Sequence, residues 1–239
     1  FSILAVGVGV LLFVLYYLYA VVLSDEDITS VIAIHQSEPL FVLILAALLL
    51  KEVPSSRELL GFLLVLLGIF WFTYSPKKSV AVALISTRSA VILAISAFVG
   101  ASATILSDTV LVDISVFDIV GQSALGYGGA GLFALLIGHY RRAALDPGRL
   151  GMARKAGLIA STGVFDLLGY VAFYQALRLS DSPAMVAVVT SIHPIYVFAL
   201  SAALAHFYPL LMRENNGNGR MTRKAVGSLI VALGVMALS

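Results

Sequence analysis

Residues 31–50 read VIAIHQSEPLFVLILAALLL, and residues 186–205 read VAVVTSIHPIYVFALSAALA. Each stretch is apolar over about 20 residues, which is the length of an α-helix that crosses the hydrocarbon core of a bilayer. Each also carries a polar residue followed by proline at the same place, Glu38-Pro39 in the first stretch and His193-Pro194 in the second. Two apolar segments that are interrupted at corresponding positions indicate a membrane protein with an internal repeat.

The composition supports a membrane protein. Of the 239 residues, 60% are hydrophobic and only 12% are charged, and the mean hydropathy is +1.02. A soluble domain typically carries about 25% charged residues. The absence of cysteine excludes disulfides and cysteine-based metal sites. The sequence also lacks the HExxH, G-x-S-x-G and phosphate-loop motifs, so it does not predict an enzyme.

Hydropathy predicts an all-α polytopic membrane protein. We interpret the apolar segments as helices, because an open sheet in lipid would leave backbone groups unpaired and barrel strands would alternate in polarity. Asp108, Asp113 and Asp118 flank a predicted loop over residues 107–115, at a spacing that does not share one helix face. We therefore expect no metal site there. Eight transmembrane segments are predicted, at about 1–23, 28–50, 59–75, 89–106, 116–138, 156–178, 184–208 and 224–238.

The repeat extends beyond the two opening stretches. Each is followed by a glycine-spaced apolar helix, with Gly61 and Gly68 in the first and Gly227 and Gly234 in the second. Each is preceded by an aromatic helix end, residues 17–24 and 173–180. Segments one to three thus match segments six to eight. The simplest account is ten helices in two five-helix halves, of which the first two helices are absent from this chain.

This account predicts two domains. Residues 1–75 would be three helices of the first half, and residues 76–239 would be the five helices of the second half. An odd number of helices in each half inverts the second half relative to the first, which predicts an inverted-topology repeat. We expect small glycine faces on the terminal helices to serve helix packing rather than solute binding.

The order and duplication of these marks resemble the EamA-type drug/metabolite transporter superfamily. The resemblance rests on the aromatic helix ends, Glu38-Pro39, His193-Pro194, Lys51-Glu52 and the glycine-spaced helices. It covers the chain from the family's third helix to its tenth. It implies ten helices in two five-helix repeats and a transport function. The chain departs from the pattern near residues 215–219, where an insert lengthens the loop.

Basic residues are distributed unevenly over the predicted loops. By the positive-inside rule, the side with the excess is cytoplasmic, which would place Ser239 outside. The resembled family usually keeps both termini in the cytoplasm, so the two arguments disagree. Three basic residues, Lys51, Arg57 and Arg178, occupy one side, and twelve occupy the other, namely Lys77, Lys78, Arg88, Arg141, Arg142, Arg149, Arg154, Lys155, Arg213, Arg220, Arg223 and Lys224.

The polar residues inside the two interrupted segments are candidates for binding a substrate or a proton. Glu38 lies near the middle of its segment, where a charge costs about 2.5–3.5 kcal/mol unless it faces a cavity. His35 lies one turn earlier on the same face. In the second copy, His193 matches Glu38 and Thr190 matches His35. The alternative is that Glu38 and His193 are hydrogen-bonded structural groups.

Pro39 and Pro194 each remove a helix hydrogen bond and are predicted to kink their helices. The carbonyls that they free could meet a substrate or a cation. It is an equally good interpretation that the two prolines only kink their helices for packing and take no part in binding.

Asp166 is the second acid within a predicted membrane helix. Tyr170 and Tyr174 follow at i+4 and i+8, so one helix face carries a carboxylate and two phenols. This stripe could line a wall for an aromatic or cationic solute, although a structural aspartate is the competing view. We interpret Tyr16, Tyr17 and Tyr19 as core or interface aromatics, and we give Gln122, Ser123 and Tyr127 a lesser chance of lining the cavity.

Together these features predict a secondary active transporter of a small organic solute that works by alternating access in the cell membrane. The hypothesis includes proton coupling through Glu38. Amino acids, other metabolites and cationic drugs all fit such a cavity. The alternatives are a non-transporting membrane scaffold, an intramembrane enzyme and a channel. The expected partners are a small-molecule substrate and the lipid bilayer, with no nucleic acid, cofactor or metal.

Overall fold

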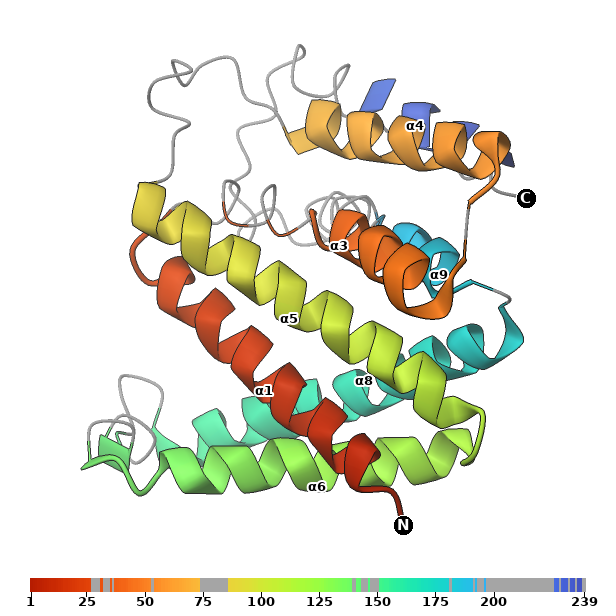
Figure 1. Ribbon diagram of the computed structural model, residues 1–239. Coiled ribbons are helices and arrows are strands. Elements are labelled where there is room, and N and C mark those ends of the chain that lie inside the picture. Colours follow the sequence, from red (N-terminus) through yellow and green to blue (C-terminus); the bar gives the residue numbers. More distant parts are fainter. Residues whose placement is uncertain are drawn as a thin grey trace. The chain divides into compact units, whose positions relative to one another are not determined.

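The computed structural model describes part of the chain, and every structural statement below concerns that part. It contains helices and no strand, in agreement with the predicted all-α class (Figure 1). The described residues are 1–26, 31, 35, 37–52, 54–73, 86–138, 141–142, 146, 151–180, 182–190, 192, 196, 226–227, 229–231, 233–234 and 236–237.

The helices follow the predicted segments. In chain order they are α1 (Ile3–Leu23), α3 (Glu38–Leu45), the π-helix η1 (Ala46–Leu50), α4 (Ser56–Thr73), α5 (Thr87–Leu111), α6 (Val116–Ala134), α8 (Met152–Leu179) and α9 (Pro183–Thr190). The described residues from 226 to 237 are also helical, and we call them the C-terminal helical segment.

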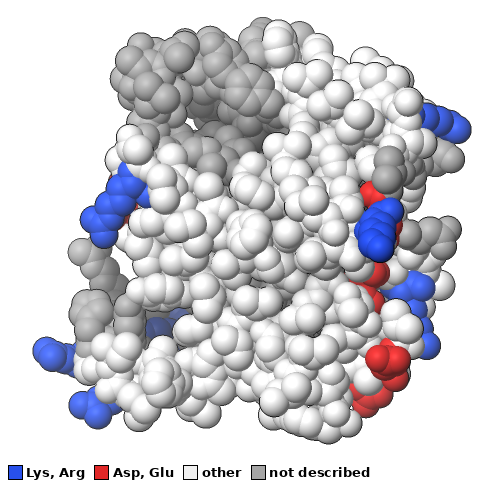
Figure 2. Space-filling view, in the orientation of Figure 1, with Lys and Arg blue, Asp and Glu red and all other residues white. Residues whose placement is uncertain are grey.

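Three of the described helices are long and apolar enough to cross a membrane. They are Ile3–Leu23, Thr87–Leu111 and Ala153–Leu179. Shorter apolar helices cover Glu38–Leu50 and Leu59–Gly68. On the described part of the surface that Figure 2 shows, Lys, Arg, Asp and Glu occur in small groups, and the residues between them are uncharged or His. The number of eight transmembrane segments stays a prediction.

The predicted loop over residues 107–115 is shorter in the structure. Helix α5 continues through Asp108 to Leu111, so only a tight turn joins it to α6. The polar residues fit the helix because their hydroxyls bond to it: Ser107 donates to the Ala103 carbonyl at 2.6 Å, and Thr109 donates to that of Ile105 at 3.0 Å.

Helix α6 begins at a capping box. The Ser115 hydroxyl accepts a hydrogen bond from the Asp118 N–H at 3.2 Å, and the Asp118 carboxylate accepts one from the Ser115 N–H. Helix α5 begins similarly, because the Ser86 hydroxyl accepts from the Ser89 N–H at 3.1 Å. Thus two of the three aspartates predicted to flank a loop belong to helices.

The chain divides into two compact units. Unit 1 comprises Phe1–Tyr17 and Val99–Pro183, and unit 2 comprises Leu18–Phe98 and Ala184–Ser239. The boundary falls inside α1 and α5. This division describes which residues pack together and is not a division into repeats, so the predicted domains 1–75 and 76–239 stay a prediction.

Unit 1 is held together by a close approach of α1 and α6. A Cβ atom added to Gly9 would lie 1.9 Å from the Ser123 carbonyl oxygen, and one added to Gly126 would lie 2.0 Å from that of Val6. The two backbones can therefore approach this closely only because glycine occupies positions 9 and 126, as small residues permit in membrane proteins. Helix α8 runs beside α6 in the same unit (Figure 1).

Unit 2 contains a second glycine-mediated pair, formed by α4 and the C-terminal helical segment. A Cβ on Gly68 would lie 2.9 Å from the Gly227 carbonyl oxygen, and one on Gly234 would lie 2.8 Å from that of Gly61. The four glycines predicted to serve packing thus lie at this contact. The contact is reciprocal, because one glycine of each helix faces the carbonyl of a glycine on the other helix.

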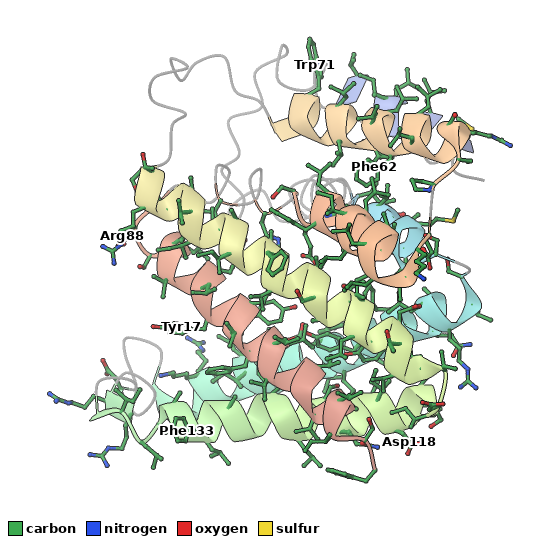
Figure 3. All side chains as sticks on the ribbon, in the orientation of Figure 1. Tyr17, Phe62, Trp71, Arg88, Asp118 and Phe133 are labelled. Carbon is green, nitrogen blue, oxygen red and sulfur yellow. The ribbon has the colours of Figure 1, made fainter. Side chains whose placement is uncertain are left out.

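The adjoining core of unit 2 contains Phe62, Val65, Val188 and Val231. Phe62 and Trp71 project from different sides of α4 (Figure 3). Phe62 is buried, whereas Trp71 is exposed.

Candidate functional site

The first candidate site lies where a helix is interrupted in unit 2. Residues 31 and 35 are helical, Ser37 is in a turn, and α3 begins at Glu38. Pro39 is buried in the first turn of α3, where its missing N–H removes no helical bond. The Leu40 N–H donates to the Ser37 carbonyl at 3.0 Å and closes the turn. Proline thus separates two helical pieces within one predicted span.

The interruption brings an acid and a base together. His35 Nδ1 lies 3.8 Å from Glu38 Oε2, and the two side chains are 18% and 25% exposed. The distance exceeds that of a direct hydrogen bond but permits an ion pair when the imidazole is protonated. The partial exposure leaves both groups accessible to a proton or a solute. Glu38 also sits at the N-terminus of α3, where the helix dipole favours a carboxylate.

Tyr19 is a neighbour of this pair that the sequence did not assign to the site. Its ring meets the His35 imidazole at 89°, with the ring centroids 5.1 Å apart. The sequence signal was the position of Tyr19 at an aromatic helix end just before the interrupted segment. The sequence predicts a core or interface aromatic at this position, because the position alone does not place Tyr19 beside His35.

The matching residues of the second copy are described only in part. Thr190 is the last residue of α9, and its hydroxyl donates to the Val186 carbonyl of its own helix at 2.7 Å. His193 and Pro194 lie outside the described residues.

The second candidate site is a tyrosine cluster in unit 1. The Tyr170 hydroxyl donates to the Tyr16 hydroxyl at 3.2 Å. The Tyr16 ring meets the Tyr127 ring at 75°, with centroids 6.3 Å apart. Phe13 packs edge-on against Tyr127 at 5.7 Å. Helices α1, α6 and α8 therefore each contribute at least one aromatic ring to this cluster.

The predicted stripe on α8 divides into exposed and buried parts. Asp166 is exposed, Tyr170 is half-buried, and Tyr174 is buried. The Tyr174 ring stacks on that of Tyr170, with the ring centroids 6.0 Å apart. Tyr174 thus belongs to the core of unit 1. Only the Asp166–Tyr170 end of the stripe is accessible.

Two weaker candidates also have structural partners. Gln122 Oε1 accepts a hydrogen bond from the Ser2 N–H at 2.6 Å and so holds the start of the chain against α6. The buried Ser123 hydroxyl donates to the Val120 carbonyl at 3.1 Å. Tyr127, the third residue given a lesser chance of lining the cavity, is exposed.

The described predicted site residues thus fall in two units. Unit 2 holds His35, Glu38 and Thr190, and unit 1 holds Asp166, Tyr170 and Tyr174. Among the described residues, no group of three acids or histidines could hold a metal ion. One site therefore offers proton chemistry, and the other offers aromatic rings beside a carboxylate.

Residues 2–74 match the EamA-like transporter family. This stretch contains Tyr19, His35 and Glu38, so the acid–base pair lies in the EamA-like part of the chain. The resemblance drawn from the sequence marks is supported there. EamA-like proteins are membrane transporters and not enzymes, and the chain is an integral membrane protein with apolar helices long enough to cross a bilayer.

The fold is shared with a solved structure over nearly the whole chain. That structure is titled only as the crystal structure of a protein; it has a TM-score of 0.69 and is 13% identical to this chain. The alignment covers 97% of this chain and 75% of the other. At this identity the likeness concerns the fold alone. A comparison with curated proteins gives no match.

Proposed function

We propose that this protein is a secondary active transporter of a small organic solute, that it works by alternating access, and that Glu38 couples transport to protons. The observation that carries the proposal is the His35–Glu38 pair at the interruption before α3. A broken helix with an ionisable residue is the type of element on which many transporters build their central binding site.

The pair is suited to proton coupling because each partner changes charge on binding or losing a proton. A carboxylate at Glu38 attracts a protonated His35, whereas a protonated Glu38 does not. A proton can then bias the protein between two conformations, provided that it binds one of them more tightly. Partial exposure of both side chains allows the proton to be exchanged with water.

We include in the proposal a bilayer environment in the plasma membrane, where such a carrier would exchange solutes with the surroundings. His193 and Pro194, the predicted counterparts of Glu38 and Pro39, belong to the proposed site as well. The inverted repeat remains part of this proposal, and the reciprocal glycine contact in unit 2 supports it.

The test is solute accumulation in proteoliposomes that contain the full chain. A panel of radiolabelled amino acids, amines and nucleosides is offered with and without an imposed pH gradient. We expect one or more members to accumulate only with the gradient. Glu38→Gln should reduce gradient-driven accumulation at least about tenfold, because the amide keeps the shape of the side chain but cannot take up or release a proton. Asp25→Asn, at an exposed turn residue after α1, is the matched control.

The proposal fails if no solute accumulates above its equilibrium level with wild-type protein that is folded and inserted. The proton-coupling part fails if Glu38→Gln responds to the gradient as the wild type does. Melting temperatures in detergent would show that the variant proteins are folded.

A further inference from the structure

Asp166 is the central residue of an apolar helix. The candidate span Ala153–Leu179 extends thirteen residues to either side of it. Its side chain is exposed, and among the described residues no basic side chain pairs with it. The nearest basic residues on α8 are Lys155 and Arg178, which lie about 16–18 Å away along the helix. An acid in the middle of a membrane helix needs water or a cation as a partner.

Tyrosine rings lie on the same helix face as Asp166 and in the cluster that joins this face. Tyr170 lies one helical turn from Asp166 on the same face. Its hydroxyl bonds to that of Tyr16, whose ring meets the ring of Tyr127. Tyr16 and Tyr127 are 46% and 41% exposed.

The chemistry favours an organic cation over other ligands. A metal ion would need several oxygen or nitrogen ligands, and no group of three acids or histidines exists among the described residues. An anion would be repelled by Asp166. A neutral aromatic molecule would gain from the rings but not from the carboxylate. Ring faces and a carboxylate together recognise substituted ammonium groups.

We propose that Asp166, Tyr16, Tyr127 and Tyr170 bind the cationic group of an organic solute. This inference rests on the proposed transport function in one respect: it takes the bound cation to be the solute that is transported. The binding itself is a property of unit 1 and can be measured without transport.

The test compares choline with 3,3-dimethylbutan-1-ol, its uncharged counterpart in which carbon replaces nitrogen. Equilibrium binding to the full chain is measured in lipid nanodiscs. We expect saturable choline binding and at least about tenfold weaker binding of the alcohol. Asp166→Asn should weaken choline binding about tenfold, and Asp113→Asn, an exposed acid between α5 and α6, should leave it unchanged. Tyr127→Leu should weaken binding, whereas Tyr127→Phe should retain it.

The inference is overturned if folded wild-type protein binds no choline, if it binds the alcohol equally well, or if Asp166→Asn binds choline as the wild type does. The choline–alcohol comparison needs no variant, so it decides even if Asp166→Asn fails to fold. Choline binding without gradient-driven accumulation of any solute would contradict the proposed function and leave this inference intact.

Discussion

The two units pack their helices in the same way, but the acid of the candidate site, Glu38 in unit 2 and Asp166 in unit 1, has different surroundings in each. In unit 1, α1 and α6 touch through Gly9 and Gly126, and in unit 2, α4 and the C-terminal helical segment touch through Gly68 and Gly234. Unit 2 holds its acid at a break in a helix beside a histidine. Unit 1 holds its acid in the middle of a continuous helix near tyrosines, whose rings form a cluster.

The difference indicates a division of labour. A carboxylate beside an imidazole can exchange a proton, because both groups titrate. A carboxylate beside phenol rings can bind an organic cation, because the ring faces attract the positive charge and, unlike an imidazole, the phenols do not exchange a proton near neutral pH. The shared glycine packing would then be the scaffold, and the two acids would carry the separate functions. The following experiments test first the scaffold and then the local contacts.

The largest effect on stability is expected at the contact of unit 1. Gly126→Ala would place a methyl group 2.0 Å from the Val6 carbonyl oxygen, and backbone atoms cannot move aside as a side chain can. We expect a loss of at least about 1–3 kcal/mol of unfolding free energy. Gly121→Ala on the same helix meets nothing within 4 Å and should leave stability unchanged. Unfolding in detergent measures both variants, and equal stability of the two would contradict the close approach.

A smaller and reciprocal effect is expected in unit 2. Gly68→Ala and Gly234→Ala would each place a methyl group 2.7–2.8 Å from a backbone nitrogen of the partner helix. Because the two contacts mirror one another, each variant should lose a similar amount of unfolding free energy, about 1–2 kcal/mol. The double variant should lose less than the sum, since both residues act on one interface. Strongly unequal single effects would argue against the mirrored arrangement.

A still smaller effect is expected in the tyrosine cluster. Tyr170→Phe removes the hydroxyl that bonds to Tyr16 and keeps the ring. One hydrogen bond between partly exposed groups contributes about 0.5–1.5 kcal/mol, so the melting temperature should fall slightly. Tyr196→Phe, at an exposed residue of unit 2, is the control. If Tyr170→Phe lost as much unfolding free energy as Gly126→Ala, the hydroxyl pair would be a main support of the fold of unit 1 and not a minor surface contact.

The smallest effect concerns the loop after α1. Hydrogen bonds from the Ser89 hydroxyl and the Ser86 N–H lower the pKa of Glu26. A lowered pKa in the folded state means that the carboxylate adds stability at neutral pH and loses this contribution as the pH falls through that pKa. Glu26→Gln should therefore lower the melting temperature slightly at pH 7. The difference should shrink below about pH 4; a difference that is constant across pH would contradict this assignment.

The sequence predicted most of the local structure, because its signals are local. Apolar runs located the helices, the Glu38-Pro39 pair located the interruption, and the i, i+3 spacing placed His35 beside Glu38. The glycine spacing identified the contact faces of α4 and its partner. Each of these inferences needs only the geometry of one helix or of two matching helices.

What the sequence could not give depends on which helices meet. Gly9 and Gly126 are far apart in the chain, and no repeat links them. Spacing placed Tyr174 on the Asp166 face but could not show that its end of that face is buried. Similarly, the segment around Asp108 was predicted to be a loop but is helical, because hydropathy does not register hydroxyls that bond to their own helix.

The most direct test of the central claim, that Glu38 couples solute transport to protons, is to measure proton movement itself. Proteoliposomes with a trapped pH-sensitive dye and no imposed gradient would receive a solute that the wild type accumulates. The account predicts a change of internal pH with wild-type protein and with Asp166→Asn at saturating solute, and none with Glu38→Gln. An undiminished pH change with Glu38→Gln would contradict it.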